Sequence, residues 1–390
     1  MRTLIDRYRM LIEETPTDYV RDIHDSIDWN DQLIAIMGAR GVGKTTLVLQ
    51  HIKLHEDLGK TLFVYADDVW FSAHSLFDLA ELFYKEGGKA LYIDEIHKYA
   101  NWSQEIKNIS DSLPRLRVCY TGSSVLDLQK GSHDLSRRLL NYHLYGLSFR
   151  EYIALSRGID IPKHTLEQIL SGEIDFPFDK YRPIELFKEY LKEGYYPFFR
   201  RSGYYLRLNN IINTVIEQDI PRFAELTVSM AEKLKILLYI IAQSVPFKPN
   251  YTKIARDIDT NRNVVSDLVV WLEKAELINV LRDETSGIKL LGKVNKIYLN
   301  NPNLAYALSD DIPNIGNIRE TIFLTWLKVG HKITASSVSD FKVGKYTFEV
   351  GGKNKGQAQV KDVKNAYIVK DDIEHGFKEV VPLWAFGLLY

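Results

Sequence analysis

A glycine-rich loop between a strand and a helix is the feature that most constrains this chain. Residues 38–45 read Gly-Ala-Arg-Gly-Val-Gly-Lys-Thr, which matches the pattern G-x-x-x-x-G-K-[ST]. An apolar run over 33–37 precedes the loop, and a helical pattern over 46–55 follows it. In that context the backbone N–H groups turn inward around phosphate groups, so a chance match is a weak alternative. The motif predicts an α/β core with a parallel sheet and a nucleotide site.

The loop also predicts how ATP and Mg²⁺ are bound. Lys44 is expected to meet the β and γ phosphate oxygens, and the hydroxyl of Thr45 is expected to face Mg²⁺. The predicted nucleotide-binding residues are Gly38, Ala39, Arg40, Gly41, Val42, Gly43, Lys44, Thr45 and Thr46.

Two adjacent carboxylates, Asp94 and Glu95, follow the apolar run over 90–93. This is the Walker B arrangement, in which Asp94 holds Mg²⁺ directly or through water. Glu95 would then polarise the water that attacks the γ-phosphate. The alternative, a strand-end pair that caps the next helix, is weakened by the upstream loop. The chain is therefore predicted to be an ATPase.

Further candidates for catalysis follow the next apolar run, over 116–120. Either Thr121 or Ser123 can reach between the carboxylates and the γ-phosphate, and capping of a helix near residue 125 is an equal alternative. Arg137 and Arg138 are candidates for a transition-state charge clamp in their own site or in that of a neighbouring subunit. The alternative for them is two solvated arginines on a helix surface.

Length and composition bound the rest of the chain. Its 390 residues exceed what one hydrophobic core usually organises. A single cysteine, Cys119, excludes a disulfide framework, and no stretch approaches 18 apolar residues, so a cytoplasmic protein without membrane contact is expected. The pattern predicts an ATPase core over 1–147, a helical lid and connector over 148–229, a winged helix over 230–310 and a small α/β domain over 311–390.

Taken together, these motifs resemble the predicted AAA+ ATPases of bacteria and archaea. The segments that carry the likeness are the loop over 38–45, Tyr92–His97, Thr121–Ser124, Leu135–Arg138 and Leu147–Tyr152. The resemblance implies an ATPase core near the archaeal-type and signal-transducing clade, followed by a winged helix and a carboxyl-terminal domain related to restriction endonucleases. It also implies a lid, marked by residues 194–197, that contacts the nucleotide side of the core.

The sequence of the predicted winged helix does not decide whether this segment binds DNA. Asn261, Arg262 and Asn263 begin the second helix of the predicted helix-turn-helix, where DNA-binding versions place their contacts. Residues 250–300 hold eight Lys and Arg against seven Asp and Glu, a net charge of +1. That charge is weak for a module that must neutralise phosphates, so contact with double-stranded DNA and a role in packing alone both remain.

The carboxyl-terminal segment resembles the metal-binding core of restriction-like nucleases. Asp340 and Glu349 are the predicted metal ligands, and Glu320 is a further candidate. The pattern expects a lysine two residues after the glutamate, where this chain has glycine, and Lys353 or Lys355 would have to replace it. A degenerate domain that keeps the fold and binds a partner is the alternative.

Three functions are consistent with these patterns. The first is an ATPase whose cycle controls what the carboxyl-terminal domain does to nucleic acid. The second is an ATP-dependent switch or scaffold with slow turnover that binds a protein partner through a degenerate nuclease domain. The third is a metal-dependent nuclease. A homo-oligomer is a further expectation, in which Arg137 or Arg138 would reach the nucleotide of a neighbouring subunit.

Overall fold

The chain divides into two compact units, Met1–Tyr145 (unit 1) and Gly146–Tyr390 (unit 2). The computed structural model describes residues 1–124, 135, 137–224, 226–244, 247–284, 293–309, 311–356 and 361–390. The first boundary lies two residues from the predicted one. The three segments predicted after it, 148–229, 230–310 and 311–390, belong to a single unit.

Unit 1 is built on a five-stranded parallel sheet with the order β2-β3-β4-β1-β5. Its strands are β1 (Leu33–Gly38), β2 (Thr61–Tyr65), β3 (Ala90–Asp94), β4 (Arg117–Ser123) and β5 (Leu140–His143). Every residue of β1 and β3 is buried, which explains why these strands read as continuous apolar runs. The predicted parallel sheet is confirmed, and Cys119 lies buried within it.

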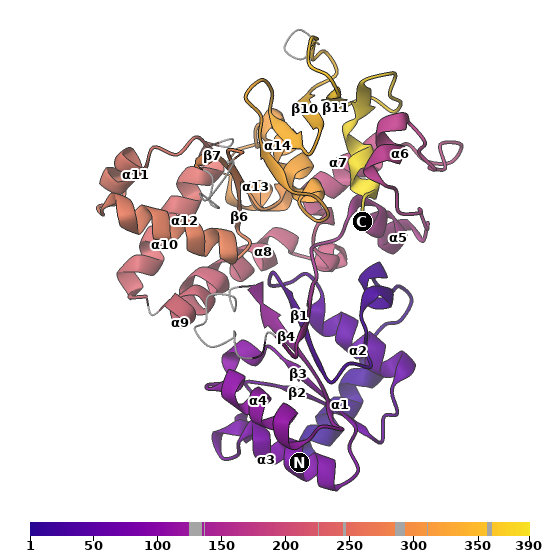
Figure 1. The fold of residues 1–390 in the computed structure, drawn as a ribbon, viewed down its shortest axis with the longest axis vertical. Helices are drawn as coiled ribbons and strands as arrows, with labels where there is room; N and C mark the ends of the chain where they lie inside the picture. The colour runs from indigo at the N-terminus through magenta and orange to yellow at the C-terminus, as the bar shows by residue number, and fades with distance from the viewer. Residues whose placement is uncertain are drawn as a thin grey trace. The chain divides into compact units, whose positions relative to one another are not determined.

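Helices cover both faces of this sheet. Figure 1 shows α1 and α2 on one face and α3 and α4 on the other. Their bounds are α1 (Arg2–Glu14), α2 (Lys44–His55), α3 (Leu76–Lys85) and α4 (Trp102–Ser112), with short 3₁₀ turns η1 (Asp22–Ser26), η2 (Val69–Ser72) and η3 (Ile96–Lys98). Because the strands are parallel, β1, β3 and β4 all end at the same edge, which gathers the residues that follow them.

Unit 2 begins with a series of helices. A second group follows, in which three helices precede a hairpin and one helix comes after it. The first part contains α5 (Phe149–Arg157), α6 (Leu166–Ser171), α7 (Pro183–Glu189), η6 (Tyr190–Gly194), η7 (Pro197–Arg200), α8 (Tyr204–Thr214), η8 (Val215–Asp219) and α9 (Ile220–Ala224). The second contains α10 (Val228–Gln243), α11 (Tyr251–Asp257), α12 (Arg262–Lys274), the antiparallel strands β6 (Ile278–Arg282) and β7 (Val294–Leu299), and α13 (Pro302–Leu308). Two helices followed by a hairpin is the order on which the winged-helix prediction is based.

A second sheet closes unit 2, with the order β12-β11-β10-β9-β8. It consists of β8 (Ile333–Ala335), β9 (Phe341–Val343), β10 (Tyr346–Gly351), β11 (Ala366–Lys370) and β12 (Val380–Pro382), flanked by α14 (Ile315–Leu327) and η9 (Leu383–Leu388). β8, β9 and β10 pair antiparallel, whereas β10, β11 and β12 pair parallel.

Aromatic packing explains why the later segments form one unit. Trp326 on α14 lies 5.6 Å from Tyr190 between ring centroids and donates a hydrogen bond to its hydroxyl at 3.1 Å. The side chain of Asn303 accepts from the backbone N–H of Tyr195 at 2.8 Å and donates to the carbonyl of Leu191 at 2.8 Å. The lid-like residues 194–197 therefore belong to the core that the later helices share, and their contact with nucleotide stays a prediction.

Within the ranges described above, none of the helices combines the length and the apolar character needed to cross a bilayer.

Candidate functional site

The glycine-rich loop connects β1 to α2 through left-handed backbone. The φ angles are 151° at Gly38, 87° at Gly41 and 103° at Gly43, a region that glycine occupies without the strain of a side chain. A Cβ atom on Gly38 would lie 2.2 Å from the carbonyl oxygen of Leu144, so the loop could not pass here with any other residue. The φ angles favour glycine at all three positions, and the close approach of Leu144 also requires it at Gly38.

Two cationic side chains donate hydrogen bonds to backbone carbonyl oxygens of the loop. The ammonium group of Lys44 donates to the carbonyl oxygens of Gly38 at 2.7 Å and Ala39 at 2.8 Å. The guanidinium group of Arg21 donates to the carbonyl oxygens of Val42 at 3.3 Å and Tyr145 at 3.2 Å. The sequence does not predict this role for Arg21, because the residue lies outside the motif and no local spacing links it to the loop.

Asp94 stands at the centre of the strand edge. Its carboxylate accepts one hydrogen bond from Thr45 Oγ1 at 2.8 Å and one from Thr121 Oγ1 at 2.5 Å. The residue is 2% exposed, and this burial raises its pKa, although the two hydroxyl donors oppose the shift. A carboxylate beside a hydroxyl provides the hard oxygen ligands that Mg²⁺ prefers, so Thr45 and Asp94 fit the predicted metal role.

Thr121 also connects the two carboxylate residues. Its hydroxyl accepts from the backbone N–H of Glu95 at 3.0 Å while it donates to Asp94. Glu95 has a φ of 51°, in the left-handed region that non-glycine residues rarely adopt, and this backbone turns it away from the strand direction. Ser123, the other candidate sensor, pairs in register with Gly38 at the end of β4. The structure thus brings Thr45, Asp94, Glu95 and Thr121 together.

The carboxylate of Glu95 lies between two cations. Arg40 Nη2 is 3.5 Å from Glu95 Oε1, and Lys98 Nζ contacts Glu95 Oε2. Lys98 also binds Asp67 at 2.6 Å. Burial raises the pKa of Glu95, but the hydrogen bond from Lys98 and the charges of Arg40 and Lys98 outweigh it and lower the pKa. Glu95 is therefore ionised at neutral pH, as a general base must be.

We expect Lys98→Met to shift the pH dependence of ATP hydrolysis. Without its main hydrogen-bond donor, the desolvated carboxylate of Glu95 should have a higher pKa. Since the base works ionised, activity would then fall at a higher pH as the solution is acidified. The acid limb of a kcat–pH profile measures this, with Lys85→Met, from a surface pair with Glu81, as the control. An acid limb at the wild-type position would show that Lys98 does not tune Glu95.

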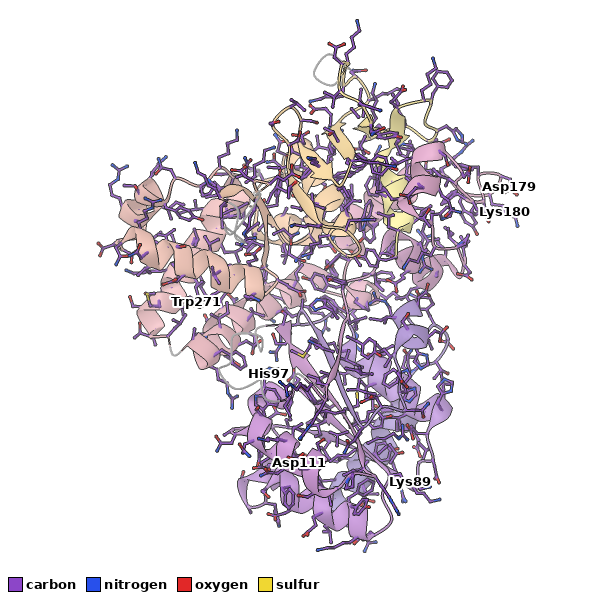
Figure 2. The ribbon with its side chains drawn as sticks, in the orientation of Figure 1. Lys89, His97, Asp111, Asp179, Lys180 and Trp271 are labelled. Carbon is purple, nitrogen blue, oxygen red and sulfur yellow. The ribbon has the colours of Figure 1, made fainter. Side chains whose placement is uncertain are left out.

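The structure does not bring Arg137 and Arg138 to this edge. They lie in a turn just before β5, which begins with Leu140 opposite Ile34, and Arg138 pairs with Asp111. Gly38 lies four steps along β1 from Ile34, roughly 13 Å at about 3.3 Å per residue. Figure 2 labels Asp111 apart from His97, which lies two residues after Glu95. A role for either arginine at its own nucleotide or at a neighbour's stays a prediction.

The segment expected to form a helix before Arg137 and Arg138 lies outside the described part of the chain. Residues 125–134, which include the position of the predicted helix near residue 125, carry no structural description.

In unit 2 the predicted metal ligands each have a lysine partner. Lys296 Nζ lies 3.3 Å from Asp340 Oδ1 and 3.1 Å from Glu320 Oε2. Lys355 Nζ lies 2.5 Å from Glu349 Oε1. All of these residues are described, and the carboxylates of Glu320, Asp340 and Glu349 do not form a set of three mutually adjacent ligands. The metal role of Asp340 and Glu349 stays a prediction.

Gly351 occupies the position where the nuclease pattern expects a lysine, and its lack of a side chain gives space to another lysine. A Cβ atom on Gly351 would lie 2.7 Å from the side chain of Lys355, so the glycine leaves room for Lys355 to fold back onto β10. Of the two replacement lysines considered from the sequence, Lys355 is the one that reaches Glu349.

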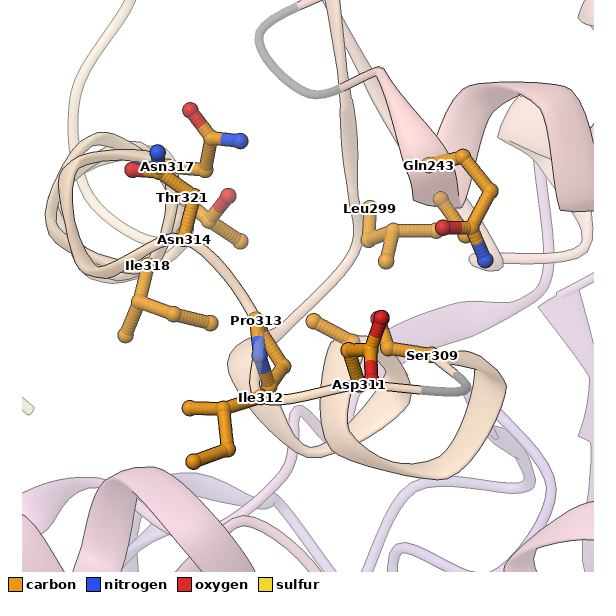
Figure 3. Close-up of a pocket in the computed structure, with 12 residues that line it drawn as sticks. Gln243, Leu299, Ser309, Asp311, Ile312, Pro313, Asn314, Asn317, Ile318 and Thr321 are labelled. Carbon is orange, nitrogen blue, oxygen red and sulfur yellow. The ribbon is translucent and has the colours of Figure 1, made fainter.

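A small pocket lies between α10, β7, α13 and α14. Figure 3 shows Gln243 and Leu299 on one side and Ile318 and Thr321 on the other. Its volume of about 150 Å³ is below the roughly 300–1,000 Å³ of small-molecule sites, so it is too small for a nucleotide.

Comparison with known proteins supports the reading of unit 1. Residues 30–153 match a family model described as an AAA domain, and residues 184–315 match a domain of unknown function, DUF8612. An uncharacterized protein of Methanocaldococcus jannaschii is 28% identical over 315 residues, which cover 75% of this chain and 66% of the relative. The match thus spans just under two thirds of that relative's length.

Two solved structures are also similar at 16% identity. One, from work on katanin self-assembly, has a TM-score of 0.27 and covers 41% of this chain and 57% of its own. The other, PCH-2 of C. elegans, has a TM-score of 0.25 and covers 70% and 67%. The match of residues 30–153 to a model described as an AAA domain agrees with the sequence motifs of unit 1.

Proposed function

Because residues 30–153 match a family model described as an AAA domain, we propose that unit 1 binds ATP with Mg²⁺ and hydrolyses it. The observation that carries the proposal is the chain of hydrogen bonds from Thr45 through Asp94 and Thr121 to the backbone of Glu95. It joins the loop that receives phosphates to the carboxylate that acts on water.

Each residue of this edge has a part in the proposed reaction. The backbone N–H groups of the loop and the ammonium group of Lys44 bind the phosphate oxygens of ATP. Thr45 and Asp94 would hold Mg²⁺, which neutralises charge on the β and γ oxygens when bound. Glu95 takes a proton from the attacking water, and its ion pairs with Arg40 and Lys98 fix where its carboxylate points.

The same ion pairs favour slow turnover as a second candidate. A base held between two cations has a lowered pKa and accepts a proton less readily, so chemistry would wait until these contacts loosen. Under this proposal the protein is an ATP-dependent switch that spends most of its time with ATP bound.

A role of unit 2 on double-stranded DNA is the remaining part of the proposal. The side chain of Asn261 accepts from the backbone N–H groups of Asn263 at 3.0 Å and Val264 at 3.1 Å, so it caps α12. This leaves Arg262 and Asn263, both exposed, as the residues of the predicted contact that can reach DNA.

Steady-state phosphate release separates these proposals. We expect turnover that EDTA abolishes, because the charge on the β and γ oxygens then lacks Mg²⁺. Double-stranded DNA should raise the rate if unit 2 couples to it, whereas slow turnover unaffected by DNA supports the switch. A rate per subunit that rises with protein concentration would indicate a homo-oligomer with a shared site. Turnover that persists in excess EDTA would contradict the proposal.

A further inference from the structure

Three histidines converge beside the carboxyl-terminal half of α2. His51 and His55 lie on this helix, and His24 lies on η1. Each offers a ring nitrogen, and these three atoms all lie within 4.8 Å of one another. The shortest separation, between His24 Nε2 and His51 Nδ1, is 3.1 Å.

The fold places these rings in three ways. The spacing of four residues puts His51 and His55 on one face of α2. Trp29 stacks on His51 with ring centroids 3.8 Å apart and an angle of 7°, and its indole N–H donates to the carbonyl of His24 at 2.9 Å. His24 and His51 are buried, whereas His55 is exposed at the end of the helix. Trp29 and α2 therefore hold the two buried rings in place, and the exposed His55 lies at the solvent side of the cluster.

Carboxylates stand behind the two buried rings. His24 Nδ1 is 3.1 Å from Asp25 Oδ1, and His51 Nε2 is 3.5 Å from Glu56 Oε1, within ion-pair distance but without a hydrogen bond. Arg117 and Tyr92 also bind Glu56, each at 2.8 Å. Each buried histidine thus directs one ring nitrogen into the cluster and the other towards a carboxylate. This is the arrangement that metal-binding histidines adopt in proteins, because the outer carboxylate fixes the ring and raises its basicity.

We propose that His24, His51 and His55 bind a divalent transition-metal ion of the zinc class, with water in the fourth position. Ligand nitrogens about 2.0–2.1 Å from a tetrahedral zinc ion lie about 3.3–3.4 Å apart, close to the separation of the two buried rings. Imidazole nitrogens suit zinc, nickel or cobalt rather than Mg²⁺, so this ion is distinct from the one that accompanies ATP.

A hydrogen bond between the rings of His24 and His51 is the competing explanation. It accounts for the 3.1 Å separation but not for the third histidine. The ring of His55 lies tilted to His24 at a centroid distance of 5.1 Å and stacks on His51 at 5.4 Å. If a metal binds, it ties η1 to the helix that begins at Lys44. The ion would then stabilise the base of the phosphate loop without contacting nucleotide.

Cobalt titration of the full chain tests this proposal. The protein carries no polyhistidine tag, is stripped with a chelator and is titrated with Co²⁺ alone, without nucleotide, while visible absorption is followed. We expect one equivalent to give tetrahedral Co²⁺ bands that Zn²⁺ displaces. His55→Gln should weaken binding by at least about tenfold, since even the loss of an outer-shell partner costs about 10–100-fold. His74→Gln, an exposed histidine of the same unit, should bind as the wild type does.

Two further measurements keep the test decisive. Because His55 is exposed, His55→Gln should fold, and Zn²⁺ should raise the unfolding temperature of the wild type but not of this variant. Asp25→Asn, which changes only the outer carboxylate, should bind more weakly than wild type. Equal Co²⁺ affinity in wild type and His55→Gln would overturn the proposal. So would binding that is lost in Asp94→Asn and kept in His55→Gln, since it would place the ion at the phosphate loop.

Discussion

Replacement of Glu95 by glutamine is expected to lower the kcat of ATP hydrolysis by about 10²–10⁴-fold, the usual contribution of a general base. Glutamine keeps the shape of the side chain but cannot accept a proton from water. ATP affinity should change little, because the loop, Lys44 and Thr45 are untouched. The backbone N–H that bonds to Thr121 also remains, so the strand edge should keep its geometry.

Phosphate release at saturating ATP measures the loss, and equilibrium binding of a fluorescent ATP analogue measures the retained affinity. Glu81→Gln is a matched control, because Glu81 is a half-exposed glutamate that pairs with Lys85 on α3. Glutamine also loses the ion pairs to Arg40 and Lys98, so unfolding temperatures of both variants must be compared. Hydrolysis at the wild-type rate in Glu95→Gln would mean that another group activates the water.

The sequence predicts the parts of this site that are set by local pattern. The loop, the buried strands and the residues that end them follow from spacing along the chain, because parallel strands bring their carboxyl ends to one edge. Thr121 was identified in this way as a polar residue after a strand. The hydrogen bonds that it makes to Asp94 and to the backbone of Glu95 required coordinates.

Contacts between side chains distant in sequence could not be predicted. Arg21 reaches the loop across 21 residues, and no motif indicates this. The pairing of Arg40 with Glu95 depends on how the loop turns, and Lys98 becomes informative only once the φ of Glu95 is known. The four-residue spacing of His51 and His55 is visible in the sequence, but the third histidine comes from a separate turn.

The joining of the later segments into one compact unit also depends on contacts between residues distant in sequence. Changes in pattern near residues 148, 230 and 311 mark changes in secondary structure, and the sequence predicts domain boundaries there. Burial of Trp326 against Tyr190 and hydrogen bonds from Asn303 join the segments into one core. Neither contact leaves a periodic pattern in the sequence.

Replacement of Lys44 by alanine should have the other large effect, on ATP binding. Lys44 is expected to give two charge-assisted hydrogen bonds to phosphate oxygens, each contributing about 1.5–3 kcal/mol. Their loss corresponds to a decrease in ATP affinity of roughly 10²–10⁴-fold. Titration with the fluorescent analogue measures this, with Lys85→Ala, from the exposed pair on α3, as the control.

The ammonium group of Lys44 also binds the carbonyl oxygens of Gly38 and Ala39, so a loosened loop could by itself reduce affinity. Comparison of ATP with ADP separates the two causes. A lysine that contacts the γ-phosphate favours ATP over ADP, and its removal should abolish that preference. A loosened loop would weaken both nucleotides equally. Full affinity for ATP in Lys44→Ala would exclude a phosphate-binding role for this loop, and with it the proposed hydrolysis.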